Sequence, residues 1–131
     1  GPSVTLSANP VIRGGEFISE ASVSGITASD CTLTMLGSAA LTGTGTLMER
    51  TTLFWNSSGT ITGGTAFGGG IIDAEQAVNS FTITNFTFYP GSGLLDRFKR
   101  GTYTNAFILA GGGDVGDRQF RFGPERQLLP T

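Results

Sequence analysis

The chain has 131 residues, of which 38% are hydrophobic and only 14% are charged, and it contains 21 glycines, one cysteine and no histidine. A chain of this length is expected to form one domain with its own core. The formal net charge of −2, with acidic residues interleaved among the basic ones of the last third, argues against a nucleic-acid binder, which needs a clustered basic face. The lack of histidine excludes Ser-His and Cys-His nucleophile pairs, and one cysteine excludes a cysteine-based metal cage.

The two ends of the sequence give expectations about its organisation. The opening "GPS" is typical of the scar that a viral cysteine protease leaves after removing a purification tag, so we expect the native start after residues 1–3. We expect a single β domain over residues 4–131, with a C-terminal tail from about residue 123. No apolar run approaches the roughly 18 residues that span a bilayer, so membrane insertion is not predicted.

The first third of the chain alternates with period two, which is typical of strands. "SVTLSA" (3–8), "ASVSGITA" (21–28) and "CTLTML" (31–36) all follow this pattern. The last places Cys31, Leu33 and Met35 on one face. We interpret Cys31 as a buried structural thiol rather than a nucleophile, because no histidine is present to act as its base.

The middle of the chain mixes glycine and threonine with bulky residues. "TGTGTLMERTTLFW" (42–55) predicts either one extended strand or a tight hairpin around Glu49 and Arg50. "NSSG" (56–59) predicts a turn, and "TITG" and "TAFGGGII" follow as further strands. The apolar residues are too regular and too bulky for a flexible linker.

The segment "SFTITNFTFYP" (80–90) is the strongest predicted strand, and its apolar side switches midway. Phe81 and Ile83 lie on the face that continues with Asn85, whereas Phe86 and Phe88 lie on the opposite face. Such a switch indicates a bulge, or a second half that meets a different partner.

Helical signals are scarce in the rest of the chain. "DAEQAVN" (73–79) and "GLLDRFKRG" (93–101) each predict one helical turn at most, and "TYTNAFILAGGG" and "RQFRF" resume the strand pattern. About nine to eleven short strands predict an all-β fold, as an antiparallel sandwich, jelly roll or barrel, possibly in an intertwined trimer. A β-solenoid or interwoven trimeric β-prism is an open alternative, but no fixed repeat period survives beyond two segments.

Aromatic residues at strand ends are the candidate ligand-binding residues. Trp55 stands beside Asn56, and an aromatic ring next to amide and hydroxyl groups suits a sugar ring; Tyr89 and Tyr103 are further candidates. The alternative for Trp55 is a residue that caps the core. Paired carboxylates for a glycosidase and a calcium loop in "GGGDVGDRQ" (111–119) are both weaker interpretations than ordinary loop residues. No catalytic residue, metal or cofactor is predicted.

The texture of "LGSAALTGTGTLMERTTLFW" (36–55) and "GTITGGTAFGGG" (59–70) resembles that of phage virion appendages, such as tail-fibre or spike tips and capsid decoration proteins. The resemblance implies a homotrimer, high stability and attachment rather than catalysis. It places the chain on the virion, with capsid or tail proteins, or a host-surface glycan or protein, as partners.

Two functions therefore compete. The first is a non-enzymatic virion module, either a receptor-binding tip or a capsid decoration protein. The second is a carbohydrate-binding or adhesin domain excised from a larger cellular protein. A glycan contact through Trp55, Tyr89 or Tyr103 suits the tip and the adhesin but not a capsid clamp. An enzyme is not predicted.

Overall fold

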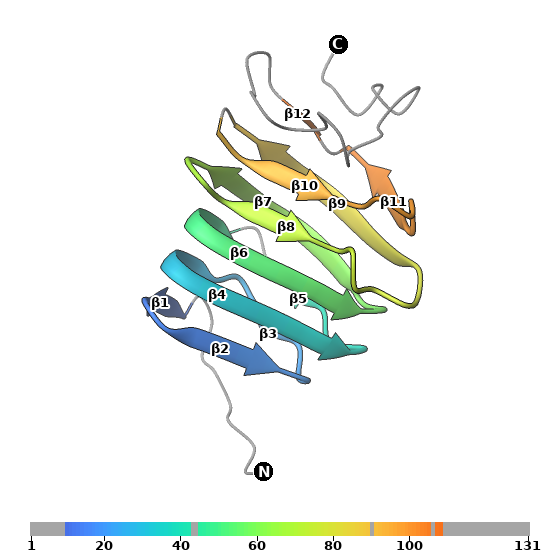
Figure 1. Ribbon diagram of the computed structural model, residues 1–131, viewed down its shortest axis with the longest axis horizontal. Helices are drawn as coiled ribbons and strands as arrows, with labels where there is room; N and C mark the ends of the chain where they lie inside the picture. The colour runs from blue at the N-terminus through green and yellow to red at the C-terminus, as the bar shows by residue number, and fades with distance from the viewer. Residues whose placement is uncertain (1–9, 43–44, 90, 106, 109–131) are drawn as a thin grey trace.

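The computed structural model describes residues 10–42, 45–89, 91–105 and 107–108, and every strand pairing within them is parallel. No helix occurs in these residues. The chain winds into a coil whose successive turns stack beside one another (Figure 1). Its strands are β1 (Val11–Arg13), β2 (Glu16–Ser19), β3 (Val23–Ser24), β4 (Thr27–Gly37), β5 (Leu41–Thr42), β6 (Leu47–Ser57), β7 (Thr60–Phe67), β8 (Ile71–Asp73), β9 (Phe81–Phe88), β10 (Gly93–Leu95), β11 (Gly101–Thr104) and β12 (Phe107–Ile108).

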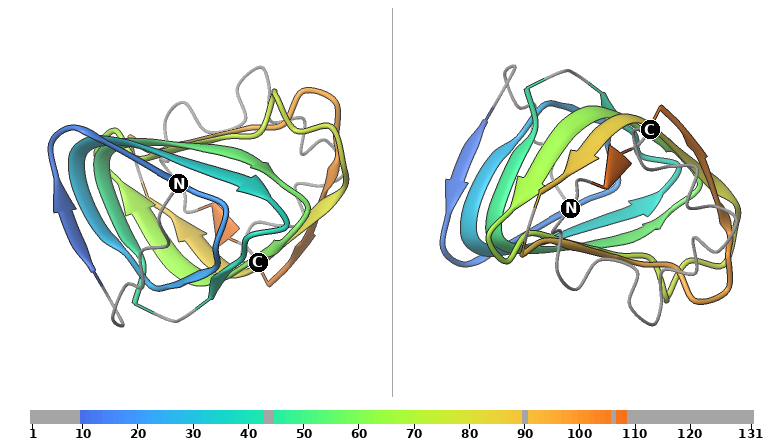
Figure 2. Two further views of the ribbon diagram at one scale, coloured as in Figure 1. Left: turned by 90° about the horizontal axis from the view of Figure 1, so that it is seen from below. Right: turned by 90° about the horizontal axis from the view of Figure 1, so that it is seen from above.

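Seen along the coil, the chain traces a closed, roughly three-sided outline (Figure 2). One continuous parallel sheet of 12 strands forms the three sides of this outline, which we call faces A, B and C. Face A, at the front of Figure 1, contains β2, β8, β10 and the second halves of β4 and β6. Face B contains β3, β5, β11 and the first halves of β7 and β9. Face C contains β1, β12, the first halves of β4 and β6, and the second halves of β7 and β9.

The all-β prediction is confirmed, but the antiparallel sandwich, jelly roll or barrel is wrong, because the sheet is parallel and forms a β-solenoid. Period-two alternation is the same in both arrangements, so it could not distinguish them. The length of a turn also varies along the coil. Leu41 pairs with Ile61, 20 residues on, whereas Ile61 pairs with Ile83, 22 residues on, and Val11 pairs with Thr27, only 16 residues on. This variation hides the repeat.

Several long strands bend where they pass from one face to the next. β4 bends at Asp30, β6 at Arg50 and β9 at Asn85, and each of these residues has a positive φ, of 54°, 47° and 57° respectively. Such a φ is costly for most residues, and Asn and Asp tolerate it best after glycine. The bend at Asn85 explains the predicted switch of the apolar side, because the second half of β9 belongs to another face. Residues 47–57 form one bent strand rather than a hairpin.

The interior of the coil is filled by the alternate side chains of all three faces, in rows that run along the coil axis. Leu33, Leu53, Ile72 and Leu94 form a row from face A, each with no exposed surface. The predicted inward row of Cys31, Leu33 and Met35 is confirmed. The other interior side chains include Val23, Ile26, Ala28, Leu41, Met48, Trp55, Ile61, Ala66, Phe81, Ile83, Phe86 and Phe88.

Local predictions between the strands had mixed outcomes. The bend at Ser58 and Gly59 confirms the turn predicted for "NSSG". The two predicted helical turns are wrong: residues 74–77 form a hydrogen-bonded turn, and residues 93–101 contain β10, a turn and the start of β11. The predictions for "SVTLSA", "GGGDVGDRQ", "RQFRF" and the C-terminal tail fall outside the described residues.

Candidate functional site

Trp55 points into the coil and has no exposed surface, so it is a core residue and offers no surface platform in this structure. Its Nε1 has no hydrogen-bond partner among the described residues. Asn56, the next residue on β6, is half-buried on the outer side of face A, and its Oδ1 likewise has no partner within that part of the chain. The structure therefore separates these two side chains onto opposite sides of one strand.

The two tyrosines also lie apart from Trp55 and from each other in the coil. Tyr89 follows β9 and is 41% exposed. Tyr103, on β11, packs against the core, with its ring edge-on to Phe81 at a centroid distance of 6.3 Å. The four predicted residues thus form no single site, and binding by the exposed Tyr89 stays a prediction.

Tyr103 belongs instead to a cluster built around the buried carboxylate of Asp96. Asp96, which follows β10, is 4% exposed. Its Oδ2 accepts hydrogen bonds from the Tyr103 hydroxyl at 2.6 Å and from the backbone N–H of Gly101 at 2.9 Å. Its Oδ1 accepts one from the N–H of Arg100 at 3.0 Å. Burial of the ring, the negative charge of Asp96 and this hydrogen bond together raise the pKa of Tyr103 above its usual range.

These hydrogen bonds fix the turn between β10 and β11, which we call the Phe98 loop (residues 96–101). Asp96 accepts a backbone hydrogen bond from Lys99 at 3.0 Å, and Lys99 has a φ of 54°. The side-chain carboxylate of Asp96 accepts three hydrogen bonds, and the two from Arg100 and Gly101 fix the backbone at the end of the loop. The loop is therefore an ordered platform rather than a loose connection.

The Phe98 loop exposes an aromatic ring that has two guanidinium groups close to it. Phe98 is 58% exposed, and the Cζ atoms of Arg97 and Arg100 lie 5.4 and 5.9 Å from its ring centroid. Arg97 also binds Glu75 of the preceding turn, with NH2 to Oε1 at 3.2 Å. Among the described residues, Arg100 has no carboxylate in ion-pair distance. The sequence predicts at most one helical turn for this segment, although the run Arg-Phe-Lys-Arg before Gly101 was a signal for an aromatic and basic surface.

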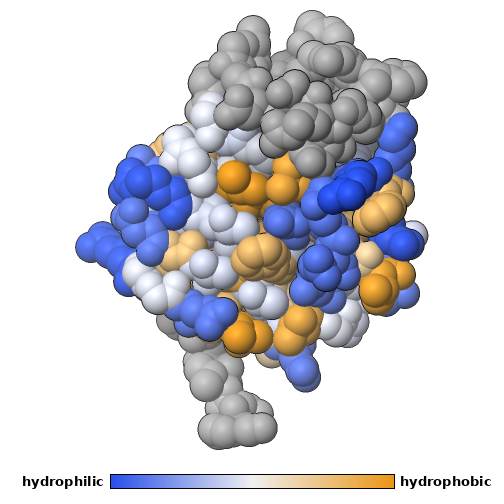
Figure 3. Space-filling model, in the orientation of Figure 1, coloured by the Kyte–Doolittle hydropathy of each residue, from blue (hydrophilic) through white to orange (hydrophobic). Residues whose placement is uncertain are grey.

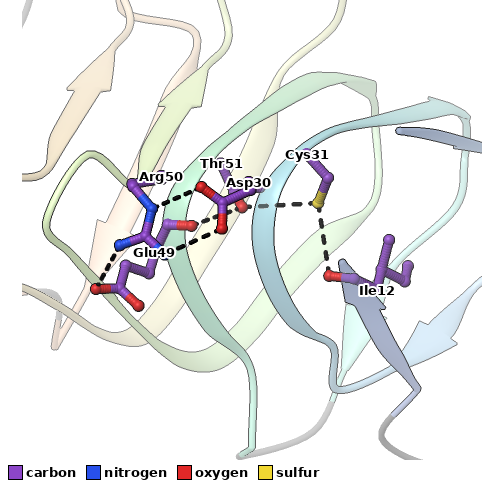
Figure 4. Close-up of polar contacts among 6 residues, drawn as sticks. All are labelled: Ile12, Asp30, Cys31, Glu49, Arg50 and Thr51. Carbon is purple, nitrogen blue, oxygen red and sulfur yellow. Dashed lines mark hydrogen bonds and ion pairs between the residues drawn. The ribbon is translucent and has the colours of Figure 1, made fainter. Parts of the chain in front are cut away.

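A second charged cluster lies at the bend between faces C and A (Figure 4). Arg50 donates from Nε to Oδ1 of Asp30 at 2.6 Å and from NH2 to Oδ2 at 3.0 Å, and its NH1 lies 3.0 Å from Oε2 of Glu49. The hydrogen bond from Arg50 lowers the pKa of Asp30. Both side chains are 56% exposed, so solvent weakens the pair. This cluster links two stacked bends, and each of its three charged side chains is paired with another member.

Cys31 and the acidic residues give no chemical centre in the described part of the chain. The Cys31 thiol is buried, 3.6 Å from the Thr51 hydroxyl and 3.8 Å from the carbonyl oxygen of Ile12 (Figure 4). This agrees with the predicted structural thiol. No group of three or more potential metal ligands occurs in residues 10–42, 45–89, 91–105 and 107–108.

None of the described segments forms a helix long and apolar enough to cross a membrane. Comparisons of the chain with protein-family models, curated proteins and solved structures gave no match.

Proposed function

We propose that the chain is a non-enzymatic attachment module of a virion, either a receptor-binding tip or a capsid decoration protein that works as a homotrimer. A carbohydrate-binding or adhesin domain of a cellular protein is the alternative. In the tip and the adhesin, the contact would be made by the Phe98 loop with an acidic glycan on the host or target surface.

The observation that carries this contact is the exposed Phe98 ring, with Arg97 and Arg100 close to it, on a backbone fixed by Asp96. An aromatic ring stacks on the apolar face of a sugar, and guanidinium groups bind carboxylate or sulfate in a planar, bidentate way. A loop that is already ordered loses little conformational freedom when it binds. Arginine is also among the residues that most often dominate the binding energy of an interface.

The test is a panel of neutral, sialylated and sulfated glycans, with binding measured at low and physiological salt. Phe98→Ala and Arg100→Gln should each weaken binding to acidic glycans by about tenfold, or ~1.4 kcal/mol. Arg13→Gln is the matched control, because Arg13 is an exposed arginine on β1, at the other end of the coil. Failure of the unmodified protein to bind any acidic glycan would overturn this contact.

The mass in solution, measured by light scattering, distinguishes the virion appendage from the cellular adhesin domain. A stable trimer supports the virion appendage, because symmetric assembly covers exposed sheet edges. A monomer that still binds acidic glycans supports the excised adhesin instead.

A further inference from the structure

Face B carries two straight rows of hydroxyl side chains on its outer surface, which we call the threonine array. One row is Ser24, Thr42, Thr62, Thr84 and Thr104, and each member is the direct pairing partner of the next. The second row is Thr60, Thr82 and Thr102, two residues earlier on β7, β9 and β11. The intervening residues, such as Ile61 and Ile83, point into the core with no exposed surface.

The array is regular in two directions. Neighbouring strands lie about 4.8 Å apart, and alternate residues of a parallel strand lie about 6.6 Å apart. β-Branched threonine has restricted χ1 rotation, so a row of threonines on one face presents its hydroxyl and methyl groups in a repeated orientation. The register and these spacings therefore repeat the hydroxyl side chains at regular intervals both along and across the strands.

Within the described part of the chain, Ser24, Thr42, Thr102 and Thr104 are exposed, and the central members Thr60, Thr62, Thr82 and Thr84 are half-buried. None of the side chains in the two rows makes a hydrogen bond to another described residue. No charged or aromatic side chain belongs to either row. An ionic ligand would find no counter-charge there, and a sugar ring would find no aromatic ring on which to stack.

We propose that the threonine array binds ice. In hexagonal ice, water molecules repeat on planes whose short spacing is close to that between β-strands and whose long spacing is comparable with that between alternate strand residues. Each threonine hydroxyl donates and accepts hydrogen bonds as water does, and the uncharged array complements an uncharged lattice. Methyl groups between the hydroxyls leave the adjoining water with few other partners, which favours an ordered layer. A periodic surface of this kind fits a periodic partner better than it fits a single small molecule.

The test measures inhibition of ice recrystallisation and adsorption of the fluorescently labelled chain to a growing ice crystal. The unmodified protein should adsorb and inhibit. Thr84→Lys, which puts a long charged side chain at the centre of the array, should require at least tenfold more protein for the same inhibition. Thr34→Lys is the matched control, because Thr34 is a half-buried outward threonine on face A, paired on both sides in the same way. It should leave inhibition unchanged.

Folding is checked by circular dichroism and thermal unfolding. If Thr84→Lys does not fold, Thr84→Tyr replaces it, since tyrosine favours strands and its bulk still breaks the array. The proposal is overturned if the unmodified protein does not adsorb to ice. It is also overturned if Thr34→Lys on face A and Thr84→Lys on face B lose inhibition of ice recrystallisation to the same extent. Adsorption to insoluble cellulose or chitin, lost in Thr84→Lys and without any effect on ice, also overturns it and assigns the array to a polysaccharide.

Discussion

Faces A and B are built from parallel strands of the same coil, yet their outer surfaces differ. One outer row of face A consists of Ile18, Thr34, Phe54, Asp73 and Leu95. Figure 3, which views this face, shows residues of intermediate hydropathy and hydrophobic residues mixed between hydrophilic margins. The matching row on face B is Ser24 followed by four threonines. Strand propensity favours threonine on both faces, so propensity alone does not explain why only face B is uniform. The difference teaches that the coil tolerates varied outer residues, so folding of the coil does not by itself require a uniform outer row on face B.

Replacing an inward side chain should have the largest effect on stability, whichever face it belongs to. Trp55→Ala removes the largest fully buried side chain and should lower the free energy of unfolding by about 3–5 kcal/mol. Phe54→Ala, at the neighbouring outward position on the same strand, is the control and should cost much less. Urea denaturation measures both. Equal costs would show that Trp55 is not inside the coil.

Tyr103 tests the interior on the side of face B. Tyr103→Phe keeps the ring but removes the hydrogen bond to the buried Asp96, so it should lower the free energy of unfolding at neutral pH by about 1.5–3 kcal/mol. The same variant should increase exchange of the Arg100 and Gly101 amides, because the carboxylate that they bind loses one anchor. Unchanged stability and exchange would contradict the anchoring role of Asp96.

The pH dependence of Tyr103 gives a separate signature. Its pKa is raised in the folded state. The contribution of Tyr103 to the free energy of unfolding is therefore fully present below the unfolded-state pKa of about 10 and is lost as pH rises above that value. Unfolding midpoints from pH 8 to 11 should therefore fall more steeply for the unmodified protein than for Tyr103→Phe. Parallel curves would contradict burial of the hydroxyl.

Asn85 tests the bend between faces B and C. Asn85→Ala loses the hydrogen bond that Asn105 Nδ2 donates to its Oδ1 at 2.6 Å and must also adopt a positive φ, so it should cost about 1–2 kcal/mol. Asn85→Gly relieves the backbone strain and should cost less. The order is measured by thermal unfolding, and a variant pair in the reverse order would argue against the bend.

The smallest effect is expected at the exposed bend between faces C and A. Asp30→Asn removes the pair with Arg50, whose stabilising effect should be weak and should fade at high salt. The pKa of Asp30 is lowered in the folded state. Its contribution to the free energy of unfolding is therefore present above the unfolded-state pKa and is lost as pH falls through the folded-state pKa. The difference in the free energy of unfolding between the unmodified protein and Asp30→Asn should therefore vanish in acid. A difference that grew in acid would contradict the ion pair between Asp30 and Arg50.

The sequence predicts the alternation of inward and outward residues in each strand, but it does not predict how the strands pair. The inward row of Cys31, Leu33 and Met35 and the switch at Asn85 followed from period two alone. The parallel coil did not, because its turns differ in length. The sequence contains similar triplets, "TIT" at 60–62, "TIT" at 82–84 and "TYT" at 102–104. Only the strand register shows that they lie side by side. The sequence allows both a ligand platform and a core residue at Trp55, because it does not show which side of the strand faces the core.

Distances along one row of face B test the parallel coil most directly. Spin labels are placed on cysteines introduced at Ser24 and Thr84, or at Ser24 and Thr104, in a Cys31→Ala background. The coil places these pairs three and four strands apart, so the backbone separations should be about 14 and 19 Å, given a strand spacing of about 4.8 Å. A separation that grows by one strand spacing between the two pairs supports the account. A 24–104 distance equal to or shorter than the 24–84 distance would contradict the parallel stacking on which both proposed surfaces depend.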